Sequence, residues 1–307
     1  MSINYSIKII KFEQENPIVP DSFLNSSAII NLPVFPKSIV FKSGLILNLY
    51  KTNKSTSDQS NIIYLGQPDS LPGFQPAYLS FLQKTDSTFS DEELLKLPNL
   101  QSNHPLYEDW KVRADSYRRL KSYFSKRKDK LILEIGAGNC WLANKLSRDT
   151  FNFVYALDIN LNELEQASRV FADNKRIKFF CGSIFDDIFE YGSFDAIILA
   201  SSLQYFDNFP ALINRLIRFL KRDSEIHIFD SPIYKQSKIK NVKENNRKYF
   251  QKIGVPALAN YYQYHSWKEF QRFRYKVLNR KNILLDKMLN KMNVKKIIRY
   301  PHILIKT

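Results

Sequence analysis

The segment of this chain whose residue types and spacing suit chemistry is LILEIGAGNCW, residues 131–141. An apolar run leads into a turn that holds Gly136 and Gly138, and a helical pattern follows. Glycines so placed let the backbone approach a ligand where a Cβ atom would clash. Asp158 lies 22 residues after Gly136, at the end of the next predicted strand. A carboxylate there can accept both ribose hydroxyls of a nucleoside cofactor, so the spacing predicts a site for such a cofactor.

Two cofactor classes use this geometry, and the residues around the turn separate them. A dinucleotide site of the form G-x-G-x-x-G needs a third glycine, but Trp141 stands in that position and disfavours NAD. The segment resembles instead motif I of class I S-adenosylmethionine-dependent methyltransferases, usually written E-x-G-x-G-x-G. Glu134, Gly136 and Gly138 match that motif, and Cys140 replaces its last glycine. Within the class, the chain resembles the bacterial small-molecule enzymes of the methyltransferase type 11/12 kind.

The resemblance continues through the following strands in the expected order. Asp158 resembles the acid that binds the ribose in that family. The loop CGSIF (181–185) resembles the one that packs on adenine, with Ser183 in the usual acid position, and SFDAIILA (193–200) resembles the approach to the fourth strand. The resemblance implies S-adenosyl-L-methionine as the cofactor, and it implies these cofactor-binding residues: Glu134, Gly136, Ala137, Gly138, Asp158, Ile159, Gly182, Ser183, Ile184, Ala200 and Ser201.

Three side chains are candidates for the catalytic base. Methyl transfer from a sulfonium is an in-line displacement with an activated leaving group, so the protein must align the nucleophile and, for a hydroxyl, accept a proton. Tyr205 stands where small-molecule methyltransferases often have the histidine of x-x-L-x-H, with a packing role as the alternative. His265 lies in an aromatic segment that suits a lid, and Tyr234 follows the fifth predicted strand. The 4 His show no metal-ligand spacing, so we predict no metal site.

The elements that must position these residues follow from the hydrophobic pattern. Buried strands are predicted at 130–135, 153–159, 176–181, 194–200 and 225–230, with helices between them at 140–147, 161–172 and 210–221 and before them at 105–128. This alternation predicts an α/β fold with a parallel sheet covered on both faces. Strand-like runs at 296–300 and 302–306, split at Pro301, predict an antiparallel pair. The resemblance implies a Rossmann-like, seven-stranded, mostly parallel sheet with an antiparallel last strand.

Two regions are predicted to flank this sheet. Residues 1–100 form a small β-rich N-terminal region, because β-branched runs at 7–12, 38–40, 45–50 and 61–65 alternate with polar loops, and a short helix opens at Ser90. Residues 101–307 form the methyltransferase domain that the resemblance implies. Its helical substrate cap is expected at about 231–296, a stretch rich in tyrosine, lysine and arginine.

The distribution of charge leaves several partners open. The formal net charge of the 307 residues is +16, and residues 231–307 alone carry 19 basic and 3 acidic residues, which equals the whole excess. Such a block suits nucleic acid, an acidic membrane surface or an anionic substrate, or else a solvated face of folded helices. A disulfide framework is excluded because the chain has only 2 Cys. Without an 18-residue apolar run or a signal-peptide pattern, we expect no membrane span and a cytoplasmic location.

Taken with the resemblance, these observations give one expected function and two alternatives. We expect methyl transfer to an O, N or C atom of a small aromatic or anionic molecule. Amino-group methyltransferases of nucleic acids carry [DNS]-P-P-[YFW] after the fourth strand, where this chain has Ala-Ser-Ser-Leu at 200–203. An RNA or protein methyltransferase that uses the basic C-terminal region is the first alternative. A non-catalytic binding module with a methyltransferase fold is the second.

Overall fold

A computed structural model describes residues 6–9, 47–50, 62–64, 72–186, 189–279 and 300–307 of the chain. The predicted runs at 38–40 and, except for Tyr300, 296–300 lie outside these residues, and those at 7–12, 45–50 and 61–65 lie partly outside them. In the described part of the chain, no helix is both long enough and apolar enough to cross a membrane.

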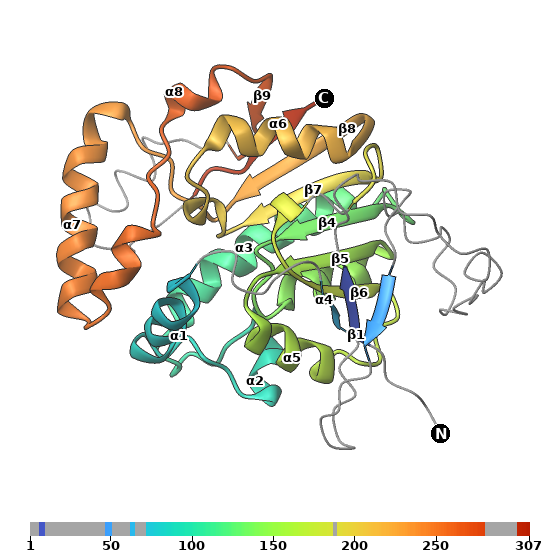
Figure 1. Cartoon of the computed structure of the whole chain (residues 1–307), viewed down its shortest axis with the longest axis horizontal. Helices are drawn as coiled ribbons and strands as arrows, with labels where there is room; N and C mark the ends of the chain where they lie inside the picture. The colour runs from blue at the N-terminus through green and yellow to red at the C-terminus, as the bar shows by residue number, and fades with distance from the viewer. Residues whose placement is uncertain (1–5, 10–46, 51–61, 65–71, 187–188, 280–299) are drawn as a thin grey trace, which may run out of the picture.

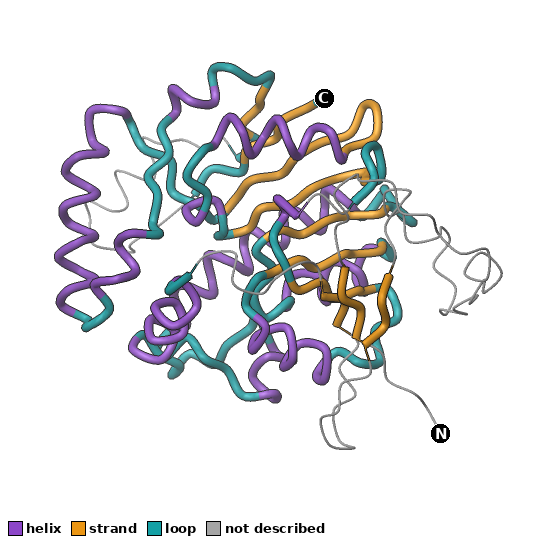
Figure 2. Tube along the Cα trace, viewed as in Figure 1, coloured by secondary structure: helices purple, strands orange, loops and turns teal. Residues whose placement is uncertain are grey.

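A twisted, mostly parallel sheet forms the centre of the molecule (Figure 1, Figure 2). Its order is β3-β6-β5-β4-β7-β8-β10-β9, and β10 runs antiparallel to both of its neighbours while the other pairs are parallel. This confirms the predicted fold class. The strands are β3 (Ile62–Tyr64), β4 (Leu131–Ile135), β5 (Phe153–Asp158), β6 (Ile177–Cys181), β7 (Phe194–Ala200), β8 (Leu220–Phe229), β9 (Tyr275–Val277) and β10 (Ile303–Lys306).

The described sheet has eight strands where seven were predicted, and the difference lies at its two edges. β3 extends the β6 edge in parallel, so a segment assigned to the N-terminal region belongs to the main sheet. β9 lies inside the stretch predicted to be mostly helical and pairs with β10 through Val277 and Ile303. The predicted run at 61–65 contains β3, but the sheet that this strand joins was not predicted, and β9 has only three residues, too few for a period to appear in the sequence.

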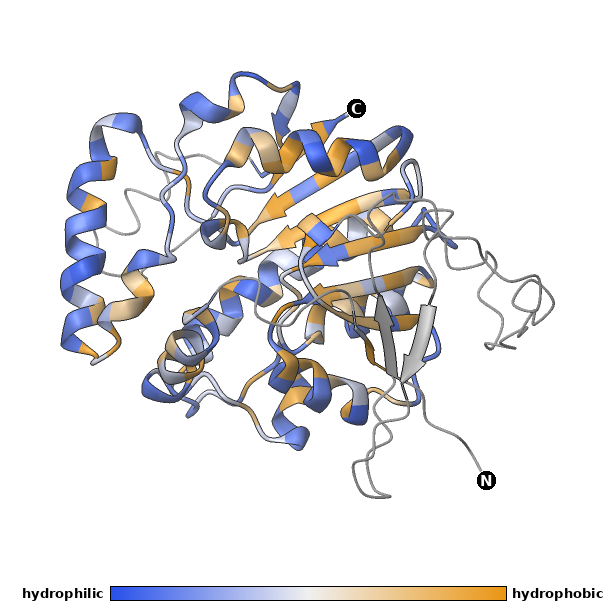
Figure 3. Cartoon of the chain, viewed as in Figure 1, coloured by the Kyte–Doolittle hydropathy of each residue, from blue (hydrophilic) through white to orange (hydrophobic). Residues whose placement is uncertain are grey.

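Helices cover both faces of the sheet, as continuous apolar strands require. Ile132 and Leu133 are neighbours in β4 but belong to separate buried clusters, one on each face. Figure 3 shows the strands as largely hydrophobic ribbons between more polar helices. One face packs against α2 (Asp91–Lys96), α3 (Tyr107–Phe124), α4 (Trp141–Thr150) and α5 (Leu161–Val170), and the other against α6 (Phe209–Phe219) and α8 (Trp267–Phe270).

α6 illustrates how local sequence produces these elements. Asn208 caps the helix because its Oδ1 accepts the backbone N–H of Ala211 at 3.0 Å, and Pro210 lies in the first turn where its missing N–H costs nothing. The buried residues recur at helical spacing, so one apolar stripe faces the sheet. These residues are Phe209, Leu212, Ile213, Leu216 and Phe219.

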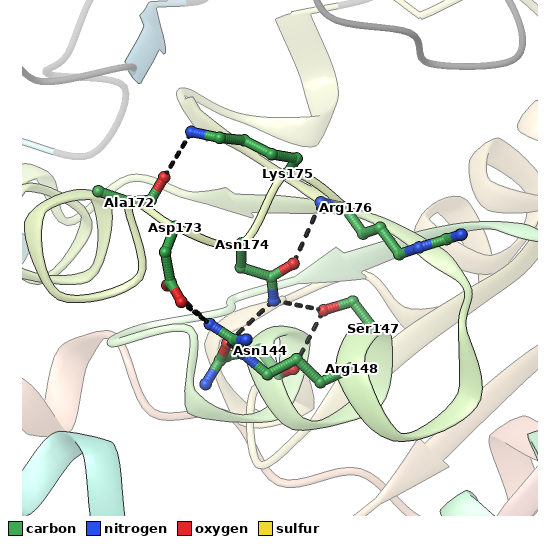
Figure 4. Close-up of polar contacts among 8 residues, drawn as sticks. All are labelled: Asn144, Ser147, Arg148, Ala172, Asp173, Asn174, Lys175 and Arg176. Atoms are coloured by element: carbon green, nitrogen blue, oxygen red, sulfur yellow. Dashed lines mark hydrogen bonds and ion pairs between the residues drawn. The ribbon is translucent and has the colours of Figure 1, made fainter.

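A polar clamp holds α4 to the turn that precedes β6 (Figure 4). Nδ2 of Asn174 donates to Oδ1 of Asn144 and to Oγ of Ser147, each at 2.9 Å. Arg148 adds a two-pronged ion pair to Asp173, with nitrogen–oxygen distances of 2.6 and 2.7 Å. Both N–H groups and the oxygen of the Asn174 side-chain amide have partners, so this buried amide is satisfied and holds α4 against the start of β6.

The N-terminal region contributes two helices, of which the sequence predicted one. α1 (Phe74–Lys84) lies in the region expected to be β-rich, where no helix was predicted, whereas α2 begins after Ser90, as predicted. A separate antiparallel pair, β1 (Ser6–Ile9) and β2 (Leu47–Tyr50), accounts for the described β-structure outside the main sheet. α1 has no side-chain N-cap and no acidic residue in its first turn, so the usual start signal is absent and packing stabilises it instead.

That packing is a third apolar cluster, which forms a cap at the carboxyl ends of the strands. α1 contributes Phe74, and α7 (Ile239–Lys252) and the short 3-10 helix η5 (Pro256–Asn260) contribute Phe250 and Leu258. Figure 1 shows α1 and α7 on the side toward which the arrowheads of β7 and β8 point. α7 and η5 lie within residues 231–296, where the cap is expected, and residues 280–296 lie outside the described part of the chain.

Two buried histidines link β8 to the residue before β10. Nδ1 of His227 lies 2.9 Å from Nε2 of His302, and Nε2 of His227 lies 3.3 Å from Oε1 of Glu225. Tyr123 of α3 donates its hydroxyl to the other oxygen of Glu225 at 2.7 Å. Burial lowers the pKa of His227 and lowers that of His302 to about 3, so both rings are neutral in the folded protein.

This pair predicts a loss of stability in mild acid. Both folded pKa values lie below the unfolded value of 6.5, so the unfolded chain binds the extra protons and gains free energy as the pH falls. When the pH falls from about 7.5 to about 5.5, protonation of these histidines in the unfolded chain should lower the free energy of unfolding by about 1–2 kcal/mol. Urea unfolding at both pH values should show a smaller loss for the double variant His227→Phe, His302→Leu. Equal losses for the two proteins would contradict the assignment.

Candidate functional site

A cavity of about 510 Å³ opens at the carboxyl ends of the parallel strands, under the cap. Its volume lies in the range that holds small molecules and cofactors. The ends of β4, β5, β6 and β7 form its floor, and α1 and the end of η5 form its roof. The floor includes Gly136, Gly138, Asp158, Ile159, Gly182, Ser183, Ile184, Asp186 and Ser201, and the roof and sides include Phe74, Tyr78, Tyr205, Asp207, Tyr261 and Gln263.

The glycine turn between β4 and α4 forms part of the floor. Gly136 has a φ of +68°, and a Cβ atom added to it would overlap with Cβ of Ser202. Ser202 is fixed there because its hydroxyl donates to the carbonyl of Ile135 at 2.7 Å. Gly138, with a φ of +52°, faces the carboxyl group of Glu163. The turn therefore leaves bare backbone facing the cavity, as the sequence predicts.

Asp158, at the end of β5, binds the glycine turn directly. Its Oδ2 accepts the backbone N–H of Gly138 at 2.7 Å, and its Oδ1 accepts the N–H of Asn160 at 2.7 Å. Burial raises the pKa of Asp158, and the backbone donors partly offset that effect. The backbone of Ile159 is a third donor to this carboxylate, which still has capacity to accept one ligand hydroxyl while it holds the turn.

Two further acids lie close to Asp158. Burial, together with the charge of Asp158, raises the pKa of Glu134 and the pKa of Glu163 to about 8 each. Oε2 of Glu134 is buried and has no hydrogen-bond partner among the described residues, whereas Oε2 of Glu163 accepts from Nδ2 of Asn160 at 2.8 Å. A cation placed beside these carboxyl groups would lower their pKa values, and the resulting carboxylates would stabilise the cation. The three acids therefore suit a cationic ligand.

Eight of the eleven predicted cofactor residues line the cavity: Gly136, Gly138, Asp158, Ile159, Gly182, Ser183, Ile184 and Ser201. Glu134, Ala137 and Ala200 do not line it, and Glu134 lies buried behind the turn. Ser183 caps the short turn after β6, since its hydroxyl accepts the N–H of Phe185 at 3.2 Å. Asp186 supplies a carboxylate to the same wall. The sequence reasoning missed Asp186 because it looked for an acid only at position 183.

The three candidate bases are not brought together. Tyr205 lines the cavity, and burial raises its pKa to about 12. His265 lies outside the lining, where its Nε2 donates to the carbonyl of Leu203 at 3.1 Å and its ring contacts Phe209. Tyr234 also lies outside it and forms a backbone bridge to Ser266. Of the three, Tyr205 is placed to contact a bound molecule, and His265 joins the loop after β7 to the cap.

Aromatic side chains from the cap complete the cavity, and the sequence reasoning missed most of them. Phe74 and Tyr78 come from α1, and the amide of Gln75 donates to the carbonyl of Ile159 at 2.5 Å, which attaches the helix to the floor. Tyr261 follows η5 and donates its hydroxyl to the carbonyl of Pro72 at 2.6 Å. A tyrosine at 261 was visible within the aromatic segment, but α1 carried no start signal and so remained unpredicted.

Comparison with known proteins agrees with this geometry. Residues 132–223 match a sequence family described as a methyltransferase domain. This segment of the chain is therefore similar to a methyltransferase domain. The matched segment holds the glycine turn, Asp158 and the strands from β4 to β7, and S-adenosyl-L-methionine is the cofactor of such domains.

Solved structures show the same fold at low sequence identity. A protein described as a sarcosine dimethylglycine methyltransferase from Galdieria sulphuraria is 12% identical with a TM-score of 0.51, over 75% of this chain and 98% of that one. Geranyl diphosphate C-methyltransferase from Streptomyces coelicolor, solved with Mg²⁺, geranyl diphosphate and S-adenosyl-L-homocysteine, is 12% identical with a TM-score of 0.50, over 77% of this chain and 98% of that one. Among curated proteins, none matches the sequence.

The turn of the methyltransferase domain yields a prediction with a matched control. Gly136→Ala adds a Cβ atom that strains the backbone and overlaps Ser202, whereas Gly192, with a φ of +70°, has nothing within 4 Å of an added Cβ. Gly192→Ala should therefore cost only the left-handed strain, roughly 1–2 kcal/mol, and leave ligand binding intact. Gly136→Ala should cost more in urea unfolding and abolish calorimetric binding of S-adenosyl-L-homocysteine. Similar behaviour of the two variants would refute a special role for the turn.

Proposed function

We propose that this protein transfers a methyl group from S-adenosyl-L-methionine to a small molecule held in the capped cavity. The observation that carries the proposal is the junction of Asp158 with the glycine turn at the floor of that cavity. The junction combines bare backbone, a carboxylate with free lone pairs and an enclosed volume, which together suit a nucleoside cofactor.

The residues around the floor fit the chemical parts of that cofactor. Asp158 is the acceptor for the ribose hydroxyls, and Ile159 and Ile184 offer apolar surface for adenine. Ser183 and Asp186 provide the polar edge beside them. The group of buried acids around Asp158 favours a ligand that carries positive charge, as a sulfonium does.

When bound, the cofactor supplies an activated methyl group, and the protein must then orient the acceptor and keep water away. The roof from α1 and η5 covers the cavity, and this cover helps to orient the acceptor and to keep water away. Tyr205 keeps its proton at neutral pH because burial raises its pKa to about 12, so it is suited to donate a hydrogen bond to the acceptor. We therefore assign Tyr205 an orienting role and no longer count His265 or Tyr234 as bases.

The enclosed site favours a small acceptor over a macromolecule. The aromatic roof supports the expectation of an acceptor with apolar surface. The basic residues that suggested RNA include those of α7, which forms the outer, hydrophilic part of the cap (Figure 3). These basic residues are not part of the cavity wall, which disfavours RNA as the acceptor. RNA or protein methylation is therefore kept only as the alternative function. Both thiols, Cys140 and Cys181, are free and buried, in keeping with a proposed cytoplasmic location.

Cofactor binding tests the proposal at Asp158. Asp158→Asn keeps the shape of the side chain but removes its charge, so it should weaken binding of S-adenosyl-L-homocysteine roughly ten- to a hundredfold, about 1.5–3 kcal/mol. Asp173→Asn is the matched control, because Asp173 is an exposed acid in the clamp at the far end of α4. Isothermal titration calorimetry measures both variants.

Two outcomes would count against the proposal. If the folded wild-type protein binds neither S-adenosyl-L-methionine nor its demethylated product, the site does not hold this cofactor. If Asp158→Asn and Asp173→Asn bind equally well, the cofactor lies elsewhere. Binding without methyl transfer to any acceptor would favour the non-catalytic binding module.

A further inference from the structure

The cavity wall carries no positive charge in the part of the chain that the structure describes. The whole chain has 46 Lys and Arg against 30 Asp and Glu, yet no described Lys, Arg or His lines the cavity. The charged residues of the wall are Asp158, Asp186 and Asp207. Asp158 and Asp186 lie in the part of the wall assigned to the cofactor, and Asp207 is exposed, so an anionic acceptor would find no cationic partner in the described wall.

Aromatic rings form the rest of the upper wall and touch one another. The ring of Phe74 lies 5.4 Å from that of Tyr205 and 5.5 Å from that of Tyr261, both edge to face. Tyr78 stacks on Phe74 at 5.4 Å and meets Tyr205 at 5.7 Å. All four line the cavity. Rings grouped around a cavity present negative faces that attract a cation, most strongly where water is excluded.

The acids near the cavity floor influence the tyrosine side chains of the upper wall. The charge of Asp158, and that of Glu163 once it ionises above a pKa of about 8, raises the pKa of Tyr78 and of Tyr205, beyond the larger effect of burial. Arg113 of α3 opposes this effect from outside the wall, where its guanidinium lies over the ring of Trp110. The balance of described groups therefore makes the cavity favourable for positive charge.

We propose that the methyl acceptor is an amine, which Phe74, Tyr78, Tyr205 and Tyr261 hold as it becomes an ammonium ion. The inference rests on the proposed methyl transfer and names the chemical class of its acceptor. The nitrogen lone pair forms the new N–C bond, the S–C bond breaks, and its electron pair stays on sulfur. Positive charge thus passes from sulfonium to ammonium, and a primary or secondary amine afterwards releases a proton to water.

The placement of the candidate bases agrees with an amine. A hydroxyl acceptor needs a base within hydrogen-bond reach, and His265 and Tyr234 lie outside the wall. The attacking species is the free amine, which forms when the ammonium ion loses its proton to water before the transfer. The methylated ammonium ion is the species that aromatic rings and acids stabilise best. The wall therefore lowers the free energy of the product of the transfer.

Three probes of one shape test the preference for positive charge. Choline carries a quaternary ammonium, 3,3-dimethylbutan-1-ol is its neutral counterpart, and 3,3-dimethylbutanoate is an anion of similar shape. Calorimetry with the protein saturated in S-adenosyl-L-homocysteine measures each affinity. That ligand has no sulfonium charge, so any preference belongs to the acceptor part of the cavity. Choline should bind roughly two- to thirtyfold more tightly than the alcohol, and the carboxylate should bind weakest.

Ring variants identify the groups responsible. Tyr205→Leu removes an aromatic face and should abolish the preference for choline, whereas Tyr205→Phe keeps the face and should retain it. Tyr78→Leu and Tyr78→Phe form a second pair on α1, in case Tyr205→Leu does not fold. Retention of the full preference in both leucine variants would overturn the assignment to these rings.

Failure of this inference is distinguishable from failure of the proposed function. If S-adenosyl-L-homocysteine does not bind, both fall. If it binds but choline binds no more tightly than the neutral alcohol, or not at all, the amine acceptor is overturned and the methyltransferase remains. A transfer assay with labelled S-adenosyl-L-methionine gives a second readout, in which benzylamine should be methylated in preference to benzyl alcohol and benzoate. Preferred methylation of either oxygen compound would overturn the inference.

Discussion

The carboxylate of Asp158 is the interaction on which the rest of the site depends. It accepts a backbone N–H from the glycine turn through Gly138 and another from the start of α5 through Asn160. These bonds connect the ends of β4 and β5, and they fix the position of bare backbone at the cavity floor. Because the group is buried, its bonds are strong and their loss is expensive. The floor is thus set by one charged side chain, and the rest of the cavity is built over it.

Much of this floor was predictable from sequence, and the roof was not. Strands β4 to β8 are long, apolar and separated by amphipathic helices, so their periodicity identifies them, and Gly136, Gly138 and Asp158 follow at fixed positions. α1 has no capping signal, and its contacts with η5 join residues far apart in sequence. His265 was a chemically reasonable base, but only the fold shows that Leu203 occupies its Nε2. The residue types indicated which side chains could take part in chemistry, whereas only the tertiary contacts show where those side chains lie.

Charge shows the same limit in a different way. The excess of +16 suggested an anionic partner, and it is a property of the chain as a whole. The cavity wall has the opposite character, with aspartates and aromatic rings. Burial accounts for much of the separation, because most lysine and arginine side chains stay at protein surfaces, where water solvates them. The net charge of the chain therefore bears on its long-range attraction of other molecules, whereas the residues of the wall decide which ligand is bound.

The bond between the hydroxyl of Tyr261 and the carbonyl of Pro72 crosses 189 residues of sequence. The segment that matches the methyltransferase family, 132–223, contains neither residue. The functional unit is consequently wider than the segment by which the family is recognised. A shortened chain, or a chimera that carried the matched segment alone, would inherit the floor of the site without its roof. Much of the cavity roof comes from the flanking regions, which can diverge while the shared floor stays the same.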